Sequence, residues 1–151
     1  MDAALRLEGG MDIERALGRL DRAVARRVSV RSMREVLQPV ASMANALWPG
    51  SSDDVFTIRT RISRGQMSDS HMVRGPSIIN LFVGAPGGGA GTPHAHLIEF
   101  GTGPRYTRNG AFRGSVSPLA MLQPAWDMHR AQMLTNLGRL IWNEIERVMA
   151  R

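Results

Sequence analysis

The chain has 151 residues, 43% of them hydrophobic, and a formal net charge of +6, which predicts one globular domain over residues 1–151. It contains no cysteine and no lysine, which excludes disulfides, thiol nucleophiles, Schiff-base chemistry and phosphate-binding loops that need a lysine. No apolar run approaches the ~18 residues that cross a bilayer, so we expect no membrane span, no signal peptide and synthesis in the cytoplasm.

Two helices are predicted in the N-terminal third of the chain, after a weakly patterned extension at residues 1–10. Asp12 is expected to cap the first helix, whose hydrophobic residues recur at helical spacing: Ile13, Leu17, Leu20, Val24 and Val28. A second helical pattern begins near Ser32 and ends before the breakers at 48–53. Pro39 lies inside it and predicts a kink or a new segment.

The middle of the chain predicts strands. Residues 55–62 alternate between apolar and polar side chains, residues 78–83 are more evenly apolar, and residues 94–100 form a third apolar run. A long polar connection at 63–75 joins the first two strands, and the glycine-rich segment 86–92 is expected to be a flexible loop.

The C-terminal third predicts a basic surface loop at 103–117 and then a long helix from about Pro118, with an apolar face over roughly 30 residues. Trp126 on this helix is expected to pack in the core or against another helix. The predicted fold class is therefore α+β, with two N-terminal helices, a small antiparallel sheet of three or four strands, and the long C-terminal helix packed on one face.

Two motifs carry a family resemblance. The first is the run from His94 to Gly103, which reads HAHLIEFGTG, and the second is the run from Pro118 to Asp127, which reads PLAMLQPAWD. In this order, after N-terminal helices, they resemble the head–tail joining or tail-completion family of long-tailed bacteriophages, whose members carry "ahlvEfGT" and "PFlrPAwd". This chain lacks the Phe and Arg of the second motif but keeps its end, from Pro124 to Asp127.

The resemblance implies a structural virion protein of the phage neck, or of a related gene transfer agent, and not an enzyme. It implies a ring of identical subunits, with six expected, that joins or completes the tail at the head–tail interface. The implied partners are the tail terminator, the stopper or connector and the tail tube, with no cofactor, no metal and no membrane. The expected location is the neck or tail of the virion, after synthesis in the host cytoplasm.

The structural or interface residues expected from these motifs are Glu99, Gly101, Thr102, Gly103, Pro124 and Trp126. A buried carboxylate must be paired or hydrogen-bonded. Glu99 is therefore expected to meet an arginine of its own chain or of a neighbour, and the alternative is a general acid or base. At least one glycine of the Gly101-Thr102-Gly103 turn is expected to need a positive φ.

Two other functions remain open on the sequence. The loop residues Arg105, Tyr106, Arg108 and Arg113 could contact DNA in a ring lumen or a protein partner, and a small basic DNA-binding module is one alternative. A metal-dependent hydrolase is the other, less favoured alternative, because on a strand His94 and His96 would share a face while Glu99 would lie on the opposite one.

Overall fold

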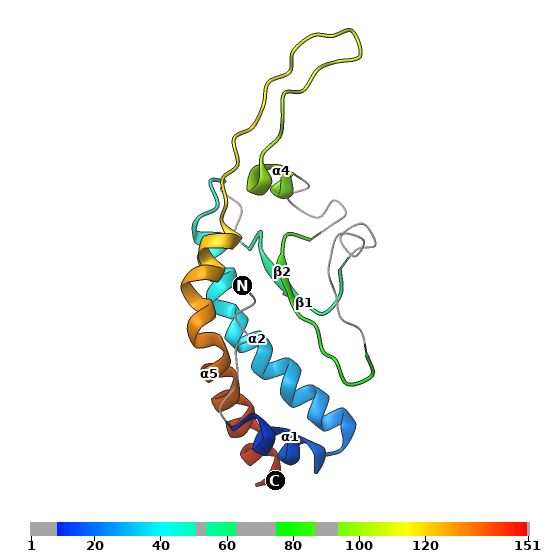
Figure 1. Ribbon diagram of the computed structural model, residues 1–151, viewed down its shortest axis with the longest axis vertical. Helices are drawn as coiled ribbons and strands as arrows, with labels where there is room; N and C mark the ends of the chain where they lie inside the picture. The colour runs from blue at the N-terminus through cyan, green and yellow to red at the C-terminus, as the bar shows by residue number, and fades with distance from the viewer. Residues whose placement is uncertain (1–8, 51–53, 63–74, 87–93, 151) are drawn as a thin grey trace.

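The computed structural model describes residues 9–50, 54–62, 75–86 and 94–150 (Figure 1). Two long helices lie side by side and form the body of the molecule. They are α2 (Arg22–Ala46) and α5 (Leu122–Met149), which run in opposite directions. A short helix, α1 (Gly10–Gly18), packs across one end of the pair. None of the helices described is long and apolar enough to cross a membrane.

The break between the first two helices lies earlier than the sequence predicted. Helix α1 ends at Gly18, and Asp21 begins α2 by accepting a hydrogen bond from the Ala23 N–H at 3.1 Å. An aspartate is a strong N-cap, and Ser32 is instead buried in the middle of α2. Helix α2 also continues through Pro39, whose side chain is exposed. Because Ser32 lies inside α2, the prediction of a helix boundary near Ser32 was wrong.

The hydrophobic core has two parts, one at each end of the helix pair. At the end near α1, the buried residues are Ile13, Val28, Ile141 and Ile145. At the other end, the helices meet the sheet and the segments around it, with a larger set of buried residues: Val40, Ala44, Val55, Phe56, Ala95, Met121 and Ala125. The second cluster includes the start of α5, so the entry to that helix is part of the core.

The sheet is smaller than predicted. Strands β1 (Thr57–Arg59) and β2 (Phe82–Gly84) pair antiparallel, with Ile58 opposite Val83, and they are the only paired strands of the sheet within the described ranges. Asn45 of α2 ties β1 to the helix, because its side chain donates to the Phe56 carbonyl at 2.9 Å and accepts from the Phe56 N–H at 2.7 Å.

The predicted third strand is a helix, and this corrects the predicted fold class. Residues Ala95–Phe100 form α4, so the described parts of the chain are a helix-rich α+β structure with a two-stranded sheet, not one of three or four strands. The two residues that α4 buries are Ala95 and Glu99, four positions apart. That spacing places both on one face of a helix, whereas a strand would bury every second residue.

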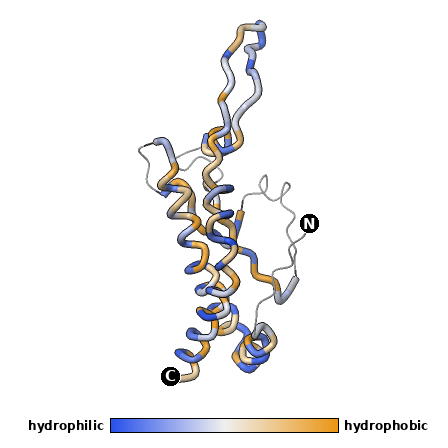
Figure 2. The backbone as a smooth tube through the Cα atoms, turned by 60° about the vertical axis from the view of Figure 1, so that its left-hand side comes forward, coloured by the Kyte–Doolittle hydropathy of each residue, from blue (hydrophilic) through white to orange (hydrophobic). Residues whose placement is uncertain are grey.

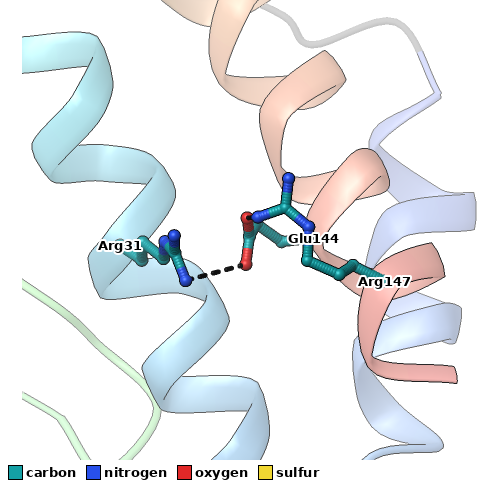
Figure 3. A network of polar contacts seen from close by, with 3 residues as sticks. All are labelled: Arg31, Glu144 and Arg147. Carbon is teal, nitrogen blue, oxygen red and sulfur yellow. Dashed lines mark hydrogen bonds and ion pairs between the residues drawn. The ribbon is translucent and has the colours of Figure 1, made fainter. Parts of the chain in front are cut away.

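A buried carboxylate joins the two long helices. Glu144 of α5 is hydrogen-bonded to Arg147 of the same helix and lies 3.7 Å from Arg31 of α2 (Figure 3). The Glu144 side chain is 11% exposed, while those of Arg31 and Arg147 are 65% and 57% exposed. The arginines therefore cover the acid from the solvent side and remain hydrated themselves.

We expect Glu144→Ala to lower the free energy of unfolding by about 1 kcal/mol, because hydrated surface partners contribute little to an ion pair. Urea denaturation at low salt and at 1 M NaCl measures this loss and its screening. Glu146→Ala, an exposed acid on the same helix, is the matched control and should change stability by less than about 0.5 kcal/mol. Equal losses in both variants would contradict a specific role for Glu144.

Candidate functional site

The start of α5 is capped by a side chain from elsewhere in the chain. Glu99 of α4 is 6% exposed, and its two carboxylate oxygens accept the Met121 N–H at 2.9 Å and the Leu122 N–H at 3.0 Å. Met121, at the N-cap position, makes no side-chain cap of its own. A carboxylate at a helix N-terminus satisfies free N–H groups and interacts favourably with the helix dipole.

This arrangement differs from the one expected for Glu99. The sequence predicted an arginine as its partner, but within the described residues the carboxylate is held by backbone N–H groups. Both oxygens are occupied by these bonds, so the acid has a structural task. The prediction that Glu99 is buried and hydrogen-bonded is confirmed, and no arginine partner of its own chain occurs among the described residues.

The residues on both sides of Glu99 hold the segment that leads into α5. The Ile98 carbonyl accepts the Leu119 N–H at 2.8 Å, and Thr102 pairs with Val116 twice. In that pair, the Thr102 N–H donates to the Val116 carbonyl at 2.8 Å, and the Val116 N–H donates to the Thr102 hydroxyl oxygen at 3.0 Å. We call residues 98–102 with 116–122 the junction.

Gly101 allows the two sides of the junction to come together. Its φ is +70°, a region that L side chains rarely adopt, which confirms the predicted positive φ. A Cβ on Gly101 would lie 2.7 Å from the Val116 carbonyl oxygen and 2.8 Å from the Pro118 nitrogen. Gly103 shows neither constraint, so of the two glycines only Gly101 is required by the backbone.

Between the two sides of the junction the chain forms a long hairpin, residues 102–116, which we call the arm. It extends away from the helical body in both views (Figure 1, Figure 2). The tip is a three-residue loop in which the Gly110 N–H donates to the Thr107 carbonyl at 2.9 Å and Gly110 has a φ of +79°. Loops of this kind need a glycine at that position.

The hairpin differs from the surface loop predicted for residues 103–117. Asn109-Gly110 is a strong hairpin dipeptide, but the flanking residues are mostly polar and show no apolar alternation, so the pattern alone does not indicate strands. Phe112 was not among the predicted site residues. It is 62% exposed, and its ring centroid lies 5.6 Å from that of Tyr106, which is 64% exposed, with the two rings tilted by 57°.

The arm carries two groups of side chains, an aromatic pair that we call the aromatic face and three arginines that we call the basic face. Tyr106 and Phe112 are opposite each other across the hairpin. Arg105 and Arg113 come next along the hairpin, and the Arg113 N–H donates to the Arg105 carbonyl at 2.7 Å. The Arg105 N–H donates to the Gly114 carbonyl at 3.0 Å, so Arg113 and Gly114 both lie opposite Arg105 in a bulge. Arg108 is in the exposed loop at the tip.

The remaining motif residues lie in the first turns of α5. Pro124 is the third residue of the helix, where a missing N–H costs nothing, and it is exposed. Trp126 is 43% exposed, so of the two expected positions, in the core or against another helix, it takes the second. Its indole lines an apolar pocket of about 270 Å³ with residues of α2, α5 and the β2 region: Leu37, Val40, Leu81, Phe82, Val83 and Leu122.

The geometry that motivated a metal site does not apply. His94 and His96 are exposed at the start of α4, and two positions along a helix turn the side chain by about 200°, so the pair does not share a face. No group of three potential metal ligands occurs among the residues described. His71, the glycine-rich segment 87–92 and most of the N-terminal extension lie outside the described ranges.

Comparison of the chain with protein-family models and curated proteins, and of its structure with solved structures, found no match.

Proposed function

We propose that this chain is a structural subunit of the neck of a long-tailed bacteriophage or gene transfer agent, and that it forms a ring which joins or completes the tail. The observation that carries the proposal is the junction. The two motifs that resemble the head–tail joining family meet there, with the Glu99 carboxylate on the backbone of Met121 and Leu122. Their shared task is to hold the arm in one direction relative to α5.

An arm of this kind supports a role in assembly. Several large apolar side chains on it and around its base are exposed in the isolated subunit: Phe100 at 78%, Tyr106 at 64%, Phe112 at 62%, Leu119 at 54% and Met128 at 67%. Large exposed apolar side chains on a projecting element favour a contact with another protein. A projecting arm that contacts a different surface of the next subunit makes a head-to-tail contact, which closes a ring when the rotation between subunits allows it.

In the proposed assembly the subunit has no catalytic step. Its partners are further copies of itself, with six subunits per ring, and the tail terminator, stopper or connector, or tail tube on either side. The aromatic face of the arm provides the contact between subunits. The junction keeps that face at a fixed angle, so that successive contacts repeat and the ring closes.

Cryo-electron microscopy of particles from the producing strain tests this proposal. We expect a symmetric ring of this chain between the capsid and the tail tube, with the arm against another protein. Tyr106→Ser with Phe112→Ser should remove the chain from the particles, because the aromatic contact is lost. The control is Met11→Ser with Met149→Ser, two methionines that are 75% and 70% exposed at the far end of the molecule. Intact tailed particles without this chain would refute the proposal.

A further inference from the structure

The arm carries positive charge and no acidic residue of its own. Arg105, Arg108 and Arg113 are all exposed, and no aspartate or glutamate occurs from Gly101 to Trp126. The ion pairs among the described residues all lie on α1, α2 and α5, and none includes an arginine of the arm. The charge of the arm itself is therefore purely positive.

The arrangement of these arginines is unfavourable for the isolated hairpin. Arg105 and Arg113 are paired across the two strands, and like charges in opposite positions destabilise a strand pair. The arm has few buried residues that could offset this repulsion. An anion bound between the two guanidinium groups would remove it, since each guanidinium presents a planar set of N–H donors.

We propose that the basic face of the arm binds the phosphodiester backbone of nucleic acid without reading its sequence. The chain itself carries a net charge of +6, which argues against a second copy as the source of the anion. A phosphate backbone offers a row of anions to the pair on the face and to Arg108 at the tip. A two-stranded β-ribbon is also narrow enough to enter the major groove of duplex DNA.

This inference concerns the free chain and does not depend on the proposed ring. The contact proposed for the ring uses the aromatic pair and the contact with nucleic acid uses the arginines, so the two contacts depend on different side chains of the arm. Three phosphate contacts make a weak and strongly salt-dependent interaction, with no base contact to hold one position. Nucleic acid could therefore slide along the arm.

Fluorescence titration of the full chain with a labelled 30-base-pair duplex, from 50 to 200 mM salt, tests the inference. Neutralising three phosphates gives a slope of log affinity against log salt of about −2.7, or about a 40-fold loss over this range. We expect Arg105→Ala, Arg108→Ala and Arg113→Ala together to make the slope shallower by about that amount. A labelled 30-nucleotide single strand, run in parallel, shows whether the backbone is bound as duplex or as single strand.

The matched control replaces three exposed arginines of α2, Arg26, Arg27 and Arg34, with alanine. It changes the net charge equally, so it should leave the slope unchanged if the arm is the site. Equal weakening by both triple variants would overturn the inference, because net charge alone would explain it. Absence of salt-dependent binding by the wild-type chain would also overturn the inference. If the triple variant of Arg105, Arg108 and Arg113 were then missing from assembled particles, the arginines would be identified as a protein contact. A ring of this chain seen in the neck of particles would support the proposed function whichever result the titration gives.

Discussion

Glu99→Ala is expected to lower the free energy of unfolding by about 3 kcal/mol, because two N–H groups at the buried start of α5 lose their acceptors. For a chain of this size the melting temperature should fall by about 6–12 °C. Thermal and urea unfolding followed by circular dichroism measure both quantities. Without the Glu99 carboxylate, the start of α5 is no longer held to α4. We therefore expect the arm to be cleaved faster in limited proteolysis.

Two further variants show whether the carboxylate itself is responsible. Glu99→Gln keeps the size of the side chain but has one acceptor oxygen, and its NH₂ group would face a backbone donor, so most of the loss should remain. Glu35→Ala removes an exposed glutamate of α2 and should change stability by less than about 0.5 kcal/mol. If Glu99→Gln were as stable as the wild type, carboxylate capping would not be what holds the junction.

Gly101→Ala is the second substitution with a large expected effect. With φ at 70° and ψ at −179°, Gly101 has a backbone conformation essentially restricted to glycine, which costs about 1–3 kcal/mol for a residue with a Cβ. The new methyl group would also meet the Val116 carbonyl oxygen at 2.7 Å and the Pro118 nitrogen at 2.8 Å. Both are backbone atoms and cannot rotate away, so overpacking adds about 1–3 kcal/mol. Chemical denaturation should show a total loss of about 2–6 kcal/mol.

Gly103→Ala is the matched control, because a Cβ at that position meets no atom within 4 Å and the backbone needs no positive φ. It should have nearly wild-type stability. In particles, Gly101→Ala should reduce incorporation even at temperatures where the chain is folded, since the arm leaves the body at an altered angle. Similar stability of the two alanine variants would show that the close approach at Gly101 is not needed.

Helix α5, and the helical character of the residues in α2, could be predicted from the sequence because the apolar spacing extends over many turns. Patterns of this length do not depend on which residues they contact. The start of α2 was harder to place, because Ile13, Leu17, Leu20, Val24 and Val28 continue one helical period across the break at 19–21. The Asp21 cap, a single residue, decides that boundary.

Short segments were predicted less well, and α4 shows the reason. The six residues from Ala95 to Phe100 contain too few turns to distinguish a helix from a strand by period. Their conformation is decided by what they contact, with Ala95 in the core cluster and Glu99 on the start of α5. Those contacts come from residues more than twenty positions away, and local pattern does not contain them.

The sequence by itself determined the long C-terminal helix, the need for a partner at Glu99, a positive φ in the Gly101-Thr102-Gly103 turn and the basic character of residues 103–117, because each follows from local residue chemistry. Only the tertiary structure decided that the partner of Glu99 is the backbone of Met121 and Leu122, that Gly101 is the glycine with the positive φ, and that the loop is a projecting hairpin with paired aromatic side chains. These features depend on strand register and on the close approach of distant segments, which the chain acquires only when it folds.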